Sequence, residues 1–325
     1  MSRTIPHSKK IRVNRLRNLH RIKSFSLAVS LSSVIKARAE KNPAMTLKTI
    51  LAVPFFSINL TEATRTGPSV GYAAEMARSQ GSHLIVAVAV VPIRASSAFF
   101  SDAKALVQAA NRELEQQARQ FAEKTAAGFE SQAFIGEVNL VADDFDGLCR
   151  QLLVLARTAD VIIMPPEDSI LSLQQSLLET MLFDSGRPII VTPQTWGGSA
   201  VPERIIVSWD GSAKSARAVG DALPLLQQAR EVEIVSVTGD PNKTKCFENA
   251  GLARHLSRHC KSINVKNLVA VDGDIAKSLG DHALNTNANM LVMGAYAHSR
   301  LRQLILGGVT DAMIHNPPLP VFMSY

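Results

Sequence analysis

The chain has 325 residues, of which 46% are hydrophobic and 5% aromatic, so it is long enough for two domains whose cores are mainly aliphatic. Residues 1–44 contain eleven Lys and Arg and one acid, Glu40, for a charge of +10, whereas the whole chain carries +7. Residues 45–325 therefore carry a net charge of −3. The positive charge of the whole chain is thus no argument that the folded body binds nucleic acid. Three cysteines without a CxxC pair argue against a disulfide framework or a zinc ribbon and indicate a reducing, cytoplasmic compartment.

We expect residues 1–44 to form a basic, disordered extension, because their composition cannot sustain a core. Their apolar stretch, Phe25 to Ile35, is too short to span a membrane. It follows a basic segment, so a signal peptide is an alternative, but Lys36 to Lys41 lacks a small-residue cleavage pattern. An organelle or membrane-surface signal, or translation from an upstream start codon, also remains open.

Residues 45–194 alternate short aliphatic runs with helix-like stretches. The predicted strands are Ile50–Val53, Leu84–Val91, Gln132–Val141, Val161–Met164 and Pro188–Thr192. The predicted helices are Thr66–Gln80, a long helix that Ser101 opens as N-cap and that continues through Leu106 to Phe121, Asp146–Thr158 and Leu171–Phe183. Five strands alternating with helices predict a doubly wound parallel sheet.

A short linker is predicted at residues 195–201. The alternation of strands and helices then repeats in residues 202–325. The predicted strands are Arg204–Val207, Val232–Val237, Val265–Val271, Met290–Met293 and Val321–Met323. The predicted helices are Ala213–Gln228, Asn249–Cys260, Ile275–Thr286 and Val309–His315. The sequence thus predicts an α/β protein with two tandem five-stranded sheets.

The two halves match piece by piece, which indicates internal duplication of one domain. The matching pairs are Thr49–Val53 with Arg204–Ser208, Ala159–Met164 with Ala288–Met293, and Arg187–Val191 with Leu319–Met323. The last strands, near Pro188–Thr192 and Pro320–Ser324, are expected at exposed edges. Such edges invite pairing, so we expect self-association through them.

Asp210, in the run Trp209-Asp210-Gly211-Ser212, follows the first strand of the second half. That position lies at the carboxyl edge of a parallel sheet, where ligands bind, and its carboxylate is suited to accept hydrogen bonds from a ribose or adenine. The alternative is that Asp210 turns the chain or caps the following helix.

Gly294, Gly307 and Gly308 could cradle phosphates with their backbone N–H groups, and Thr310 would add a hydroxyl at the start of a helix. The alternative is that Gly294 ends a strand and Gly307-Gly308 forms a tight turn, because glycine spacing alone is a weak signal.

With these residues in place, the second half resembles a universal stress protein domain. Nucleotide-binding members of that family carry Gly, two residues, Gly, nine residues, Gly, then Ser or Thr. Gly294 and Gly307 fill the first and third places, while Ala297 and Gly308 stand in the second and fourth. The resemblance extends to Val309-Thr310, Asp210-Gly211-Ser212 and Gly273-Asp274. It implies a Rossmann-like, adenine-nucleotide α-hydrolase-like fold that binds ATP, with Mg²⁺, through Asp210, Gly294, Gly307, Gly308, Val309 and Thr310.

The chain departs from that motif in both halves. The Ala297 methyl replaces a glycine where backbone should approach phosphate, and Gly308 removes a hydroxyl. In the first half, Pro54 and Phe55 stand near the place of the Asp, Pro165-Pro166 replace the strand-end glycine, and no Gly-Gly precedes the helix. Residues 45–194 are therefore predicted to be a degenerate copy, and residues 202–325 a copy with a partial nucleotide motif.

The predicted function is a stress response through ATP-dependent or ATP-modulated association with a protein partner, without catalysis and with slow hydrolysis at most. The resemblance also implies that the two domains pair pseudo-symmetrically. One alternative is a nucleotide-activating transferase, although its His-x-Gly-His or Ser-Gly-Gly loop is absent from the sequence. Another is an interaction module without nucleotide, or one whose basic extension binds nucleic acid or anionic membrane.

A metal site at His255, His259 and Cys260 is a further alternative. Their i, i+4 spacing is more typical of a solvated helix face, and we predict no metal.

Overall fold

The computed structural model describes residues 25–28, 46–57, 63–93, 101–131, 135–166, 172–238, 246–300 and 303–325. Both halves contain the five expected parallel strands. In the first half these are β2 (Thr49–Ala52), β4 (His83–Val90), β5 (Gly136–Ala142), β6 (Val161–Met164) and β7 (Ile189–Val191). In the second half they are β8 (Arg204–Ser208), β9 (Glu231–Thr238), β10 (Ile263–Val269), β11 (Met290–Gly294) and β14 (Val321–Ser324). The spatial orders β5-β4-β2-β6-β7 and β10-β9-β8-β11-β14 are equivalent, as the duplication predicts.

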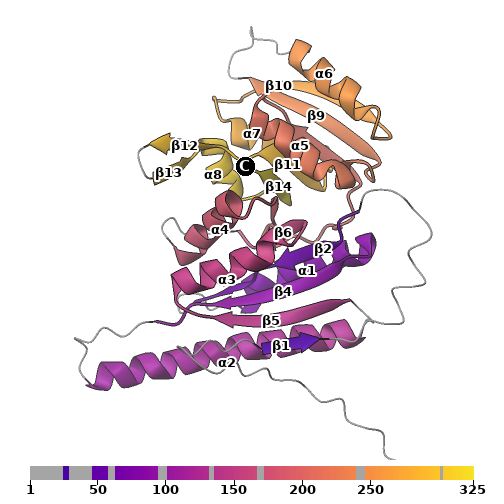
Figure 1. Ribbon diagram of the computed structural model, residues 1–325. Helices are drawn as coiled ribbons and strands as arrows, with labels where there is room; N and C mark the ends of the chain where they lie inside the picture. The colour runs from indigo at the N-terminus through magenta and orange to yellow at the C-terminus, as the bar shows by residue number, and fades with distance from the viewer. Residues whose placement is uncertain are drawn as a thin grey trace, which may run out of the picture.

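Helices cover both faces of the sheet, so the fold is doubly wound (Figure 1). One face carries α1 (Ala63–Gln80), α2 (Ser101–Ser131), α5 (Ala213–Leu226) and α6 (Cys246–Leu256). The other carries α3 (Phe145–Arg157), α4 (Leu173–Asp184), α7 (Ile275–Asn285) and α8 (Gly308–His315). Strands covered on both sides are buried throughout, as β6 and β14 are, which is why they read as unbroken apolar runs. None of the helices in the described ranges is both long and apolar enough to cross a membrane.

The two sheets are joined into one, because β7 and β14 pair antiparallel. The expectation that these strands lie at exposed edges is wrong: β7 also pairs with β6, and β14 with β11, so both sides of each strand are occupied. Ile190 faces Phe322, its counterpart in the duplication, which places a pseudo-two-fold axis at this pair. The pseudo-symmetric pairing implied by the family resemblance is thereby confirmed within the chain.

A second contact repeats this symmetry. The Nε2 of Gln80 and the Oε1 of Gln228 lie 2.7 Å apart, and the reciprocal pair of atoms is also 2.7 Å apart. Gln80 lies three residues before β4 and Gln228 three residues before β9, so the two occupy equivalent positions. A self-complementary contact between equivalent residues is what an isologous, two-fold interface produces.

Four short strands were not predicted. β1 (Phe25–Ala28) pairs antiparallel with β5 at the edge of the sheet, inside the segment expected to be disordered. The rest of residues 1–44 lies outside the described residues. β3 (Phe55–Phe56) pairs with β4, and β12 (Ala297–Arg300) forms a hairpin with β13 (Gln303–Leu306) between Gly294 and Gly307.

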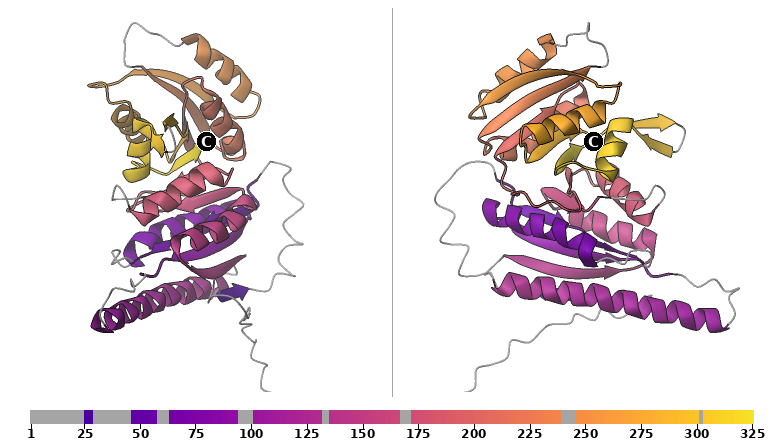
Figure 2. Two further views of the ribbon diagram at one scale, coloured as in Figure 1. Left: turned by 60° about the vertical axis from the view of Figure 1, so that its left-hand side comes forward. Right: turned by 180° about the vertical axis from the view of Figure 1, so that it is seen from behind.

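The beginning of α2 also differs from expectation. Leu106 is 71% exposed, although Leu114 and Ala118 on the same helix are buried. The first turns of α2 extend past the end of β5 (Figure 2), which agrees with the exposure of Leu106.

Candidate functional site

The predicted site residues follow the carboxyl ends of β8 and β11. These strands are neighbours in the sheet, and the strand order reverses there, which is where doubly wound sheets bind ligands. Asp210 comes two residues after β8, Gly294 is the last residue of β11, and Gly307 to Thr310 begin α8.

Asp210 turns the chain between β8 and α5. Its Oδ1 accepts a hydrogen bond from the backbone N–H of Ser212 at 2.9 Å. The helix cap is Ser212, whose Oγ accepts from the N–H of Ser215 at 3.1 Å, so the alternative of Asp210 as the cap is wrong. Burial opposes ionisation of Asp210, but hydrogen bonds from Ser212 and Ser215 outweigh it and hold the pKa of this carboxyl below its usual value. Asp210 is therefore a charged, exposed acceptor at neutral pH.

Gly294 allows α5 to approach β11 closely. A Cβ at this position would lie 2.6 Å from the carbonyl carbon of Lys214 and 2.6 Å from the backbone nitrogen of Ser215. Because both atoms belong to the helix backbone, neither can move aside without shifting α5. Packing of the helix against the strand is thus sufficient to require glycine here.

Gly307 and Thr310 are tied together through Tyr296, which the sequence analysis missed. The N–H of Gly307 donates to the Tyr296 carbonyl at 2.8 Å, and the N–H of Tyr296 donates to Oγ1 of Thr310 at 2.9 Å. A Cβ on Gly307 would lie 3.1 Å from Cδ1 of the Tyr296 ring. The buried Thr310 hydroxyl therefore holds the loop that joins β11 to α8.

The amino end of α8 differs from the four other helix starts whose caps the structure describes. Side chains of Asp144, Ser172, Ser212 and Asp274 cap α3, α4, α5 and α7, whereas the cap of α8 is Gly307, which has no side-chain hydrogen bond. The first backbone N–H groups of a helix have no partner within it and carry partial positive charge. A Cβ on Gly308 would meet nothing within 4 Å, so the space beside this helix end is open.

A cavity of about 730 Å³ lies between α7 and α8, and Gly308 and Val309 line it. Lys277 and His315 also contribute to its wall. The Nδ1 of His315 is 2.8 Å from the Asp311 carbonyl, whereas its buried Nε2 has no hydrogen-bond partner among the described residues. The opening at the amino end of α8 therefore continues into a space lined by both polar and apolar residues. Asp210, Gly294, Gly307 and Thr310 do not line this cavity.

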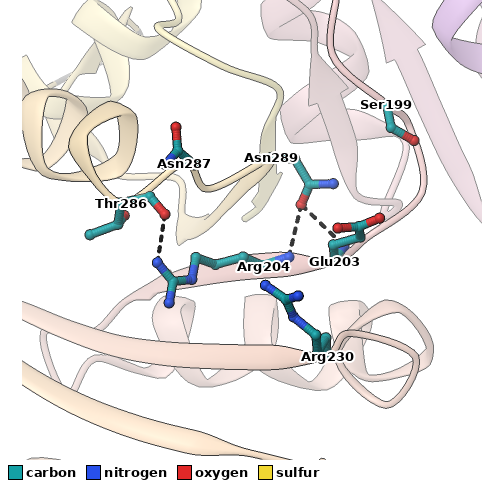
Figure 3. Close-up of a pocket in the computed structure, with 7 residues that line it drawn as sticks. All are labelled: Ser199, Glu203, Arg204, Arg230, Thr286, Asn287 and Asn289. Carbon is teal, nitrogen blue, oxygen red and sulfur yellow. Dashed lines mark hydrogen bonds between the residues drawn. The ribbon is translucent and has the colours of Figure 1, made fainter.

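A second cavity, of about 380 Å³, lies beside the opposite, amino-terminal end of β8. Figure 3 shows Arg204 reaching across it to the Thr286 carbonyl, and Arg204 Nε also donates to Glu231 at 3.0 Å. Asn289 Oδ1 accepts from the N–H groups of Glu203 and Arg204. In the first half, the Asp160 carboxylate accepts from the N–H groups of Lys48 and Thr49 in the same way. The Asn289 contacts are therefore a structural feature that both copies share.

The corresponding edge of the first half differs at the residues that the structure describes there. Phe55, near the place of the Asp, is buried in the core. The Nε2 of Gln174 donates to the Pro166 carbonyl at 2.8 Å, and Ser172 caps α4. Among the residues described at this edge, Ser172 thus supplies the capping acceptor that Gly307 lacks, and the buried Phe55 offers no polar group in place of Asp210.

The alternative metal site, at His255, His259 and Cys260, lies on the exposed face of α6 and the turn that follows it. The ring centroids of His255 and His259 lie 5.0 Å apart, and both side chains are exposed. Within the described ranges, no three His, Cys, Asp or Glu side chains are grouped closely enough to hold a metal ion.

Comparison with family models matches residues 202–324 to the universal stress protein family. No curated protein matches the chain in sequence. Among solved structures, a universal stress protein from Archaeoglobus fulgidus DSM 4304 is similar with a TM-score of 0.60 and 17% identity, over 85% of this chain and 97% of that one. A putative universal stress protein from Pseudomonas aeruginosa UCBPP-PA14 is similar with a TM-score of 0.50 and 13% identity, over 86% and 93% of the two chains. Residues 202–324 are therefore similar to the universal stress protein family, and the first half of the chain repeats the fold of that domain.

Proposed function

We propose that the second half binds an adenine nucleotide, ATP with Mg²⁺, at the carboxyl edge of β8 and β11. The observation that carries this proposal is the amino end of α8, which has a glycine cap without a side-chain acceptor and opens into a cavity. Phosphate binds at helix amino termini because the N–H groups and the helix dipole both favour an anion there. The equivalent helix of the first half has its own acceptor, Ser172, which supports binding by the second half alone.

The residues present fit such a ligand with divided roles. The N–H groups of Gly308 and Val309 are suited to the phosphates, and the charged, exposed Asp210 is suited to accept from ribose or adenine. Gly294 and Thr310 shape the loop: Gly294 admits α5, and Thr310 holds Tyr296 in place. The side chain of Ala297 lies outside the described part of the structure.

The proposed role is binding that modulates association with a protein partner in a stress response, without efficient turnover. A general base works best with a pKa near the operating pH, and the lowered pKa of Asp210 makes it a weak one. Cys149 and Cys260 are free thiols, which supports a reducing compartment such as the cytoplasm. The first half would act as the structural partner, since Ser172 already caps its matching helix.

Equilibrium dialysis of the full chain with labelled ATP tests this proposal. Asp210→Ala removes a charged acceptor, and Gly307→Val forces a side chain against Tyr296, so each should weaken binding by roughly tenfold or more. Ser172→Ala in the first half is the matched control: it should cost about 1 kcal/mol of stability through loss of a helix cap and leave ATP affinity unchanged. Absence of ATP binding by the wild-type chain would refute the proposal.

A further inference from the structure

Lys214 is a cation in the first turn of α5, where the helix dipole disfavours positive charge. Its Nζ lies 3.2 Å from the centroid of the Tyr325 ring and 5.7 Å from that of Tyr296. The Tyr296 ring is also the group that faces Gly307, and the backbone of Lys214 packs on Gly294. Lys214 thus packs against the beginning of the loop between β11 and α8, and the Tyr296 ring near its ammonium faces Gly307 at the end of that loop.

The junction of the two halves defines the resting position of Lys214. Tyr325, the last residue, packs edge-to-face on Phe183 of α4, with centroids 4.6 Å apart and an interplanar angle of 81°. Arg217, further along α5, donates to the Gly186 carbonyl at 3.2 Å. The first half therefore supports the ring on which the ammonium of Lys214 rests.

This resting contact leaves the hydrogen-bonding capacity of Lys214 available to an anion. A ring face offers only its quadrupole, whereas phosphate oxygens accept charge-assisted hydrogen bonds from the three N–H groups of an ammonium. The four-carbon stem of lysine is flexible enough to redirect that ammonium.

We propose that Lys214 binds the polyphosphate of the nucleotide, leaving the Tyr325 ring when the ligand enters, and so makes the site select nucleoside polyphosphates over nucleosides. This inference rests on the proposed nucleotide binding by the second half.

Calorimetric titration of the full chain with ATP and with adenosine tests the role of Lys214. Lys214→Met should weaken ATP binding by roughly tenfold and leave adenosine binding unchanged, because adenosine has no phosphate to lose a contact. Lys214→Arg, which keeps the charge, should restore most of the ATP affinity. Arg217→Met is the matched control: it removes one cation from the same helix and should change ATP affinity by less than about twofold, because exposed charges are screened.

The outcomes separate the two proposals. Equal losses for ATP and adenosine would show a structural role for Lys214, and an unchanged ATP affinity would show no role; either result overturns this inference and leaves nucleotide binding intact. If Arg217→Met lost as much ATP affinity as Lys214→Met, the loss would come from the change in net charge alone. That result would also overturn this inference. A wild-type chain that binds neither ligand refutes the proposed function and this inference together.

Discussion

Replacing Gly294 with alanine separates its packing role from a role in ligand binding. The new Cβ would lie 2.6 Å from two backbone atoms of α5, those of Lys214 and Ser215, so the helix must shift. Overpacking of this kind costs about 1–3 kcal/mol. The alanine also restricts the unfolded chain, which offsets about 0.4–1 kcal/mol of that cost. We therefore expect Gly294→Ala to lower the free energy of unfolding by about 1–2 kcal/mol in the absence of nucleotide.

The control is Gly308→Ala, at a position where the added Cβ meets nothing within 4 Å. That variant should be stabilised by about 0.4–1 kcal/mol, because only the unfolded chain is affected. Urea unfolding followed by far-UV circular dichroism at 25 °C measures both changes. If Gly294→Ala is as stable as wild type, or Gly308→Ala is the less stable variant, the packing argument for Gly294 fails.

Three further predictions concern the junction and the site. Phe322→Ala, at a fully buried position on the pseudo-two-fold axis, should cost about 3–5 kcal/mol in urea unfolding, and a loss below 1 kcal/mol would contradict its place in a shared core. Gln80→Leu should cost about 1 kcal/mol, because Gln228 Oε1 loses its donor while Gln228 Nε2 keeps its bond to the Pro224 carbonyl. The double change to Leu should recover most of that loss, and additive losses would argue against the pairing. A lowered pKa keeps Asp210 ionised from neutral pH until the pH falls through that value, so ATP affinity should be flat between about pH 6 and 8 and decline in acid. A tenfold change in affinity within that flat range would indicate that another group controls binding.

The inner parallel strands, such as β6, β8 and β11, could be predicted because burial on both faces produces uninterrupted aliphatic runs in the sequence. β10, at the edge of the sheet, is largely exposed. The duplication then predicted equivalent topology, since Arg187–Val191 and Leu319–Met323 match residue by residue. What the pattern could not provide was the partner of each last strand. Pairing of β7 with β14 is a non-local choice, and an edge strand offers the same unpaired groups to a neighbour in its own chain or in another.

The candidate site was predictable by residue type but not by role. Gly294 stood out as a glycine at a strand end, yet the need for it comes from an α5 backbone that only the structure places there. The difference in capping between the halves was available in the sequence, because Ser172 followed by Gln175 is a capping signature. No local pattern marks Tyr296, whose contacts depend on the packing of α8 against the end of β11.

Isothermal titration calorimetry of the full chain with ATP measures the stoichiometry of binding, which tests most directly whether the second half alone binds nucleotide. One ATP should bind per chain, because α8 in the second half has no side-chain cap, whereas Ser172 caps the matching helix α4 in the first half. Gly307→Val should weaken binding at that single site by roughly tenfold or more. Two sites per chain, a site that survives Gly307→Val unchanged, or no binding at all would contradict the account.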